Sequence, residues 1–347
     1  MIPLLIIIVA LGFILEALSL RRNPDMVEFD YQISTDTTEP DVPFKVQTRI
    51  TNKSLLPLSY LAVREIFPTV AQLPEGMLYQ TKNDGSHVRN VCRIKGLQRK
   101  KLSLETSISK RGVYLFKGDS IEFGDFLGFR EIYKKVSRNK EIVVYPKRID
   151  SAGLTDALAS FCGDVSAKRY LIRDPIITLG CREYTGREPM KDINWLQSAR
   201  RSEIMVREFD YTRQMSVSVI LSVDGIDIMD DEKLDNCCSA ARTICEKLVE
   251  KGVPVSFFTN AQLRRKEKND AWRCEVAAGR TGGLLEGLGR VSHHACSSFE
   301  KLLEYAVREN DSAASFIVIL PEGGRCNEAP ADRLRNVTGQ EVLLLRI

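Results

Sequence analysis

The feature that most constrains the fold is a change of hydrophobic period along the chain. Over residues 25–147, apolar and polar residues largely alternate, as they do in the stretch 42–50. After residue 212, continuous apolar runs such as 217–223 alternate with stretches in which apolar residues recur every three or four positions. The two parts therefore predict two modules with different secondary structure.

The alternating part, residues 25–147, predicts a β-rich module. Short strands are expected at 58–67, 102–108 and 142–145, because turn residues separate these runs. Several short strands with turns between them are typical of an antiparallel β-sandwich of immunoglobulin-like type. His87 stands alone, so we find no catalytic constellation in this module.

The C-terminal part, residues 213–347, predicts an α/β doubly wound domain. A helix is expected over 234–249 with Asp230 or Asp231 as its N-cap, and Ser297 with Glu300 forms a capping box for a second helix. Alternating strands and helices predict a mostly parallel sheet. The strands are expected at 217–223, 253–258, 271–278, 315–320 and 342–345.

The first 22 residues predict a transmembrane anchor. Residues 2–20 form a predominantly apolar run with one defect at Glu16, and Arg21 and Arg22 follow them. About 20 apolar residues span a bilayer. Because the clustered positive charge follows the apolar run, we expect a single-pass protein of the cell membrane whose bulk faces the cytoplasm.

Composition excludes several classes of partner. A net charge of +4 over 347 residues is too small to indicate nucleic-acid binding. The glycines at 282–283 and 287–289 match no nucleotide-binding pattern, so neither a nucleotide nor another cofactor is expected. The nine cysteines lie largely in apolar or helical contexts, which predicts reduced thiols and a reducing compartment.

Residues 148–212 form a linker that contains a charged motif with a tryptophan, over 181–208. Basic and acidic residues alternate here, and two interpretations are open. In the first, Arg182-Glu183 pairs with Arg207-Glu208 and Trp195 fills a core; in the second, part of the network faces outward and docks a partner. We favour the first, because Trp within the motif favours burial. The candidate interaction residues are Arg182, Glu183, Tyr184, Lys191, Trp195, Arg200, Arg207 and Glu208.

This motif resembles a known bacterial family. The residues that carry the resemblance are Arg182-Glu183-Tyr184, Ile193, Trp195, Ser198-Ala199-Arg200, Val206-Arg207-Glu208, Lys110-Arg111-Gly112-Val113-Tyr114, Asp125-Phe126-Leu127-Gly128 and Val144-Tyr145-Pro146. They are similar to the bacterial domain-of-unknown-function family fifty-eight, whose C-terminal half resembles a von Willebrand factor type A domain. The resemblance covers most of the chain and implies a MoxR-type AAA ATPase as a partner.

The chain departs from the family at two places in the motif. Where the family usually has Gly-Asp after the tyrosine, this sequence has Arg187-Glu188, and Gly186 comes one position early. Lys191 stands where the family usually has Arg. The charged positions are kept, whereas the usual glycine turn is displaced.

Asp224 occupies the position of a metal ligand in type A domains. Those that bind Mg²⁺ use Asp-x-Ser-x-Ser, because a hard cation prefers clustered oxygen ligands. Here Ile226 and Ile228 replace both serines. We therefore predict no metal and treat Asp224 as a degenerate metal-site position that caps a turn.

His293, His294, Cys274 and Cys296 are the candidates for Zn²⁺ binding or for a nucleophilic Cys–His pair. Their spacing matches no zinc template. In a strand, the two adjacent histidines would point to opposite faces. A catalytic role for these residues remains an alternative rather than the main hypothesis.

These observations predict a membrane-anchored interaction or scaffold protein that is not an enzyme, with a MoxR-type AAA ATPase as the implied partner. One alternative is a metal-dependent adhesion module of type A kind on the cell surface. The other is a hydrolase that uses Cys and His side chains. Fold similarity alone does not decide among them, because function depends on the site.

Overall fold

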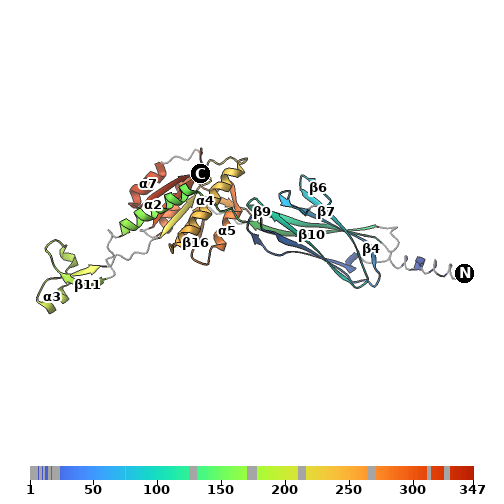
Figure 1. The fold of residues 1–347 in the computed structure, drawn as a ribbon, viewed down its shortest axis with the longest axis horizontal. Helices are drawn as coiled ribbons and strands as arrows, with labels where there is room; N and C mark the ends of the chain where they lie inside the picture. Colours follow the sequence, from blue (N-terminus) through green and yellow to red (C-terminus); the bar gives the residue numbers. More distant parts are fainter. Residues whose placement is uncertain are drawn as a thin grey trace. The chain divides into compact units, whose positions relative to one another are not determined.

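The computed structural model divides the chain into two compact units, whose elements Figure 1 labels. One contains Met1–Lys147 and Leu285–Arg290, and the other contains Arg148–Leu284 and Val291–Ile347. The structure describes residues 24–347 except 75, 125–130, 170–177, 210–215, 265–270, 311–313 and 324–328, together with positions 7, 10, 12–14 and 17. The family-like stretch 125–128 therefore lies outside the described residues.

Two β-sheets face each other in the first unit. The first sheet has the order β1 (Val27–Ile33), β3 (Phe44–Asn52), β8 (Arg99–Ile108), β5 (Ala71–Gln72). The second sheet has the order β2 (Thr37–Thr38), β10 (Glu131–Val144), β9 (Gly112–Gly124), β4 (Leu58–Phe67), β7 (Gly85–Ile94), β6 (Tyr79–Lys82). Neighbouring strands are antiparallel, except that β2 runs parallel to β10 through Val143 and Val144. A 3₁₀ turn, η1 (Pro24–Met26), precedes β1.

Alternation along each strand places the core of this unit between the sheets. In β3, Phe44, Val46, Thr48 and Ile50 are buried, whereas the alternate residues Lys45, Gln47 and Arg49 face outward. The ring of Phe116 on β9 packs edge-on against Phe44 and against Phe67 on β4. Such edge-to-face contacts add to the stability that burial of the rings provides.

One carboxyl group lies inside this apolar core. Glu65 on β4 is buried, and the hydroxyl of Thr48 on β3 donates a hydrogen bond to it. Burial raises the pKa of Glu65, although hydrogen bonds from Thr48 and Asn90 partly oppose the shift. Burial also raises the pKa of Tyr31, whose side chain lies in the same core. The core therefore favours the protonated form of Glu65.

The second unit contains a five-stranded sheet and helices. The order of the sheet is β16 (Trp272–Val276), β14 (Val255–Thr259), β13 (Val217–Leu221), β18 (Ser315–Leu320), β19 (Val342–Arg346). β15 (Ala261–Leu263) and β17 (Val291–Ala295) form a separate antiparallel pair. The described helices of this unit are α2 (Ala152–Arg169), α3 (Trp195–Arg201), α4 (Asp231–Glu250), α6 (Phe299–Glu309) and α7 (Ala329–Thr338). Helix α5 (Gly282–Arg290) begins in this unit, and its part from Leu285 to Arg290 belongs to the first unit.

Helices α4 and α6 bury apolar side chains against this sheet. From α6, Phe299, Leu302 and Ala306 pack with Ile220 of β13 and Val318 of β18. α4 contacts β13, β14 and β18 and begins at its N-cap Asp230, whose side chain accepts the Lys233 amide at 3.1 Å. The cysteines that the structure describes are reduced, and three of them, Cys237, Cys238 and Cys245, are buried in α4.

The predicted fold class is wrong for the chain as a whole. Among the described residues, strands make up 44% and helices 28%, in several sheets, and no α/β doubly wound domain of type A kind is evident. The predicted third strand, β16, runs antiparallel to β14. The element that follows β14 among the described residues is the short strand β15. For β16 to run parallel to β14, the chain would need a longer crossover connection between them, usually a helix.

The predicted transmembrane anchor is also corrected, and with it the localisation to the cell membrane. Among the residues that the structure describes, no helix has the length and apolar character needed to cross a bilayer. Most of residues 1–22, including most of 2–20, lie outside the described residues. The prediction was based only on the length of the apolar run in the sequence.

Candidate functional site

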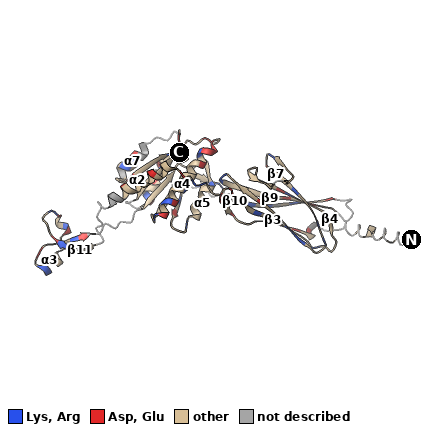
Figure 2. Ribbon diagram, viewed as in Figure 1, with Lys and Arg blue, Asp and Glu red and all other residues tan. Residues whose placement is uncertain are grey.

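The charged motif folds as a short hairpin segment, which we call the 178–209 segment. Its strands β11 (Thr178–Glu183) and β12 (Met205–Phe209) are antiparallel, and η2 (Met190–Asp192) and α3 (Trp195–Arg201) lie between them. Buried side chains are few here: Ile193, Met205 and Val206. Figure 2 shows that basic and acidic positions are both distributed along the ribbon of this segment.

Hydrogen bonds hold α3 against β11 and β12. The side chain of Asn194 caps the helix by accepting the Gln197 amide at 3.2 Å, and its Nδ2 donates to Sγ of Cys181 at 3.3 Å. The hydroxyl of Ser198 donates to the Asn194 carbonyl at 2.8 Å and accepts the Met205 amide at 2.8 Å. The orientation of α3 is thus set mainly by polar contacts.

A second set of polar contacts closes the turn after β11. Arg182 Nη2 lies 2.6 Å from Oε1 of Glu188, and Thr185 donates to this carboxylate from its hydroxyl at 2.8 Å and from its amide at 3.1 Å. These interactions, the Thr185 hydroxyl first, lower the pKa of Glu188 to about 2. Gly186 adopts a φ of 87°, so the displaced glycine is the residue that makes the turn.

The ion pairs that the sequence favoured are not the ones that form. Arg182 is opposite Val206 in the register, and Cys181 is opposite Arg207, so the two charged pairs do not face each other. Arg182 instead pairs with Glu188, a residue that the sequence analysis noted only as a departure from the family. Thr185, three positions before Glu188, is the feature of the sequence that could have predicted this turn.

The exposed apolar side chains of the segment are its most unusual feature. Trp195 is 61% exposed, Leu196 66% and Met190 69%, and Ile204 is also exposed. The expectation that Trp195 fills a core is therefore wrong. We call Met190, Trp195, Leu196 and Ile204 the α3 apolar surface.

The other predicted residues of the motif lie mostly at the surface of the segment. The amide of half-buried Tyr184 donates to the Ile204 carbonyl at 2.8 Å, which fixes the start of the turn. Arg200 and Arg201 form the exposed last turn of α3. Glu183, Lys191, Arg207 and Glu208, which the sequence analysis also named, are exposed.

Asp224 lies at the carboxyl end of β13, where it caps α6. Its Oδ2 accepts the Phe299 amide at 2.7 Å, whereas the N-cap residue Ser298 makes no capping bond with its side chain. The predicted capping box of Ser297 and Glu300 is thus replaced by a carboxylate from another part of the chain. Burial raises the pKa of Asp224, although the hydrogen bonds from Phe299 and Asn260 oppose the shift.

The side chain of Asn260 links segments at this edge of the sheet by hydrogen bonds. It is buried after β14, where its Oδ1 accepts the Val223 amide at 3.1 Å and its Nδ2 donates to the Ser297 carbonyl at 2.9 Å. Sequence reasoning missed it, although a polar residue directly after a buried strand was a usable signal. The network joins β13, β14 and the start of α6, so its evident role is structural.

The histidines and cysteines that the sequence analysis named lie in β16, in β17 and directly after β17. No group of three His, Cys, Asp or Glu residues that could hold a metal ion occurs among the described residues. In β17, the side chain of His293 is largely buried, with Nε2 3.3 Å from a carboxylate oxygen of Asp231, whereas His294 is exposed. Cys274 lies in β16, where its thiol donates to the Glu275 carbonyl at 3.7 Å.

Similarity to known proteins is limited. No model of a known family matches the sequence, and no curated protein matches it. A cohesin module of a Clostridium perfringens family 33 glycoside hydrolase is 10% identical to this chain, with a TM-score of 0.27. The similarity covers 34% of this chain and 96% of the cohesin module. A type II cohesin domain from the Acetivibrio cellulolyticus cellulosome is 8% identical, with a TM-score of 0.27 over 34% and 95%. A CARDB domain from Pyrococcus furiosus, in complex with di-metal ions, is 10% identical, with a TM-score of 0.23 over 34% and 86%. Similarities of this size carry no conclusion about what this protein binds.

Proposed function

We propose that this protein is a non-enzymatic interaction protein that binds a protein partner through the α3 apolar surface. The observation that carries the proposal is the exposure of Trp195 at 61% on a helix that hydrogen bonds hold in place. Tryptophan is enriched among the residues that dominate binding energy at interfaces. Because α3 is held before binding, its side chains lose little conformational freedom when a partner covers them.

The chemistry of the segment defines the partner. Burial of a Trp side chain removes on the order of 150–250 Å² from water, and about 25 cal/mol per Å² makes this several kcal/mol before the costs of association. Lys191, Arg200 and Arg201 are exposed beside the apolar side chains in the sequence. The partner therefore presents an apolar pocket with acidic groups opposite these three cations and a basic group opposite the exposed Glu203 beside Ile204.

A MoxR-type AAA ATPase is the partner to test first, because the family resemblance implies it. The proposal does not depend on that identity, since it rests on the exposed side chains. Crosslinked co-purification of the full chain, with the bound proteins identified by mass spectrometry, tests both points. An ATPase among them supports the finer assignment, whereas another protein replaces it.

The decisive variants are Trp195→Ser and the matched control Leu78→Ser. Leu78 is 89% exposed and lies in the first unit, so its replacement removes exposed apolar surface without touching α3. We expect Trp195→Ser to reduce recovery of the partner at least about tenfold, the size of one lost hot spot, and Leu78→Ser to leave it unchanged. Full recovery with Trp195→Ser would contradict the proposal.

Intrinsic fluorescence gives an independent readout. The chain has two tryptophans, and the ring of Trp272 packs against Phe257 at a centroid distance of 5.7 Å. In a Trp272→Phe variant, Trp195 is the sole tryptophan, so a blue shift on mixing with the purified partner reports its burial. Binding without a shift would show that the partner uses another surface.

A further inference from the structure

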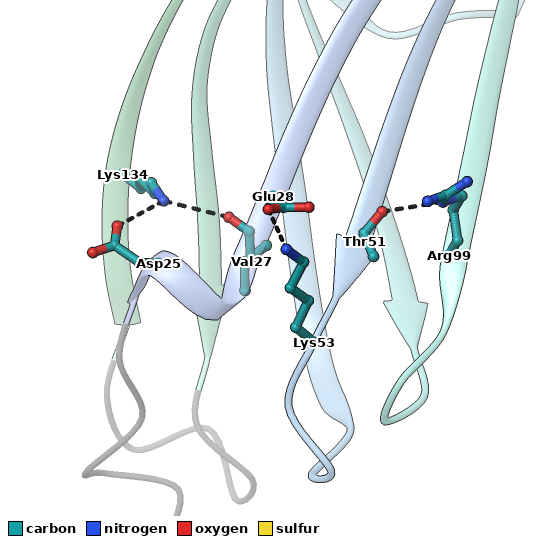
Figure 3. A network of polar contacts seen from close by, with 7 residues as sticks. All are labelled: Asp25, Val27, Glu28, Thr51, Lys53, Arg99 and Lys134. Atoms are coloured by element: carbon teal, nitrogen blue, oxygen red, sulfur yellow. Dashed lines mark hydrogen bonds and ion pairs between the residues drawn. The ribbon is translucent and has the colours of Figure 1, made fainter.

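A cavity of about 470 Å³ lies in the first unit, outside the 178–209 segment. Residues of β1 and β10 line it together with residues of β3 and β8. Lys134 of β10 links the strands, because its Nζ lies 3.1 Å from Oδ1 of Asp25 and donates to the Val27 carbonyl at 3.4 Å (Figure 3). β1 is the end strand of its sheet, and β10 pairs with β2 only through Val143 and Val144. The cavity is therefore bordered by a sheet edge rather than enclosed by paired strands.

A β-bulge places two cationic residues of β10 on the same face of the strand. The register between β10 and β9 shifts between Lys135, which is opposite Ser120, and Arg138, which is opposite Gly118. In a regular strand, Lys135 and Arg138 are three positions apart and would point to opposite faces. The extra residue of the bulge brings them to the same face, and both line the cavity together with Lys134.

Gly118 allows close packing beside the bulge. A Cβ atom at this position would lie 2.8 Å from a ring carbon of Phe29, which also lines the cavity. A glycine therefore lets the aromatic ring approach β9 at the bulge. Val27 and Phe29 are buried in the core of the unit, whereas Val136 is partly exposed and adds an apolar side chain to the cationic lining.

The lining carries more positive than negative charge. Its cations are Arg49, Arg99, Lys134, Lys135 and Arg138, and its carboxylates are Glu28 and Asp30. Neighbouring groups already engage both carboxylates: Lys53 pairs with Glu28, and Arg49 lies 3.8 Å from Asp30 (Figure 3 draws the first pair). The acidic side chains of the lining therefore do not neutralise the remaining cations.

Three cations of the lining have no carboxylate partner among the described residues. The Nε of Arg99 donates to the hydroxyl of Thr51 at 3.3 Å, and Lys135 and Arg138 are exposed. Like charges around one cavity repel each other, and an anion bound among them removes this repulsion. The guanidinium groups of Arg99 and Arg138 offer paired donors that match phosphate oxygens.

We propose that this cavity binds a small organic molecule with at least two phosphate groups. Its volume lies within the range of about 300–1,000 Å³ that is usual for small-molecule sites. The cations engage the phosphates, and the partly exposed Val136 contacts the organic part. The site shares no residue with the α3 apolar surface. A test of this site is therefore independent of the proposed protein partner.

Calorimetric titration of the full chain with inorganic pyrophosphate tests the charged part of the site. The test variant is Lys135→Gln/Arg138→Gln, and the matched control is Lys82→Gln/Arg93→Gln. Lys82 and Arg93 are exposed on β6 and β7, and β9 and β4 lie between β7 and β10 in the sheet. Both variants lose the same charge, and far-UV circular dichroism checks that each remains folded.

We expect pyrophosphate to bind the wild-type chain and the control equally, and the test variant at least about tenfold more weakly. Higher salt should weaken binding, because the contacts are ionic. A third variant, Arg99→Lys, keeps the charge and loses the guanidinium fork, so it should bind more weakly than wild type. The proposal is overturned if wild type shows no binding at low salt, or if the control loses as much affinity as the test variant.

Discussion

The β-sheets of the first unit and the 178–209 segment place their aromatic side chains in opposite ways. In the first unit, Phe67 and Phe116 are completely buried between two sheets. In the segment, Trp195 is exposed, and hydrogen bonds from Asn194 and Ser198 set the position of its helix. A short hairpin has too few residues to enclose a large side chain. An aromatic residue in it is thus available for binding rather than for stability.

The largest expected effect contrasts these two aromatic positions. Phe116→Ala should lower the free energy of unfolding of its unit by about 3–5 kcal/mol, because it removes a ring from a packed core. Trp195→Ala should change stability by less than about 0.5 kcal/mol, as surface substitutions do. Urea unfolding followed by circular dichroism measures both. A comparable loss for both variants would show that Trp195 is part of a core after all.

A smaller effect depends on pH and concerns the buried carboxyl of the first unit. The pKa of folded Glu65 is raised above its ordinary value of 4.5, so the folded state holds this proton more tightly than the unfolded state does. The stabilising contribution is complete below pH 4.5 and is lost as pH rises through the folded pKa. Glu65→Gln should therefore become more stable relative to wild type as pH increases above 4.5.

Thermal unfolding of both proteins at a series of pH values checks this prediction. The exposed residue Glu105 on β8 gives the matched control, Glu105→Gln, because the pairing of β8 places it at the outer face of the sheet. The control should follow wild type across the pH series. A difference between Glu65→Gln and wild type that does not vary with pH would contradict the assignment.

The smallest effect concerns the polar contacts that replace a core in the segment. Asn194→Ala removes the N-cap of α3 and the contact with Cys181, and it should destabilise this segment by about 1 kcal/mol. Global unfolding should change little. Hydrogen exchange should accelerate at the amides of Gln197 and Met205, and unchanged exchange would show that other contacts hold the helix.

The sequence predicted much of the secondary structure and little of the site. The expected strands 58–67 and 315–320 coincide with β4 and β18, and Asp230 caps α4 as one of its two expected candidates. These features depend on the local pattern of apolar residues and on a cap next to its helix. The direction of β16 was not predictable in this way, since it depends on the connection after β14.

The candidate sites depended on contacts that no local pattern encodes. Asp224 caps a helix that begins 75 positions later in the chain, and so it displaces a capping box that looked complete in the sequence. The β10 bulge brings Lys135 and Arg138 into one cavity, although alternation alone did not predict it. Trp195 was assigned to a core by its residue type, whereas its exposure follows from how little structure surrounds it.

The sequence alone determined where the strands and α4 form. The alternation of apolar residues and the capping residues are local features, and the spacing of apolar residues shows which face of a strand or helix is buried. The tertiary structure alone decided which side chains remain at the surface and which charges meet. Exposure and pairing are properties of segments brought together from distant parts of the chain, such as Asp224 with Phe299 and Arg49 with Asp30.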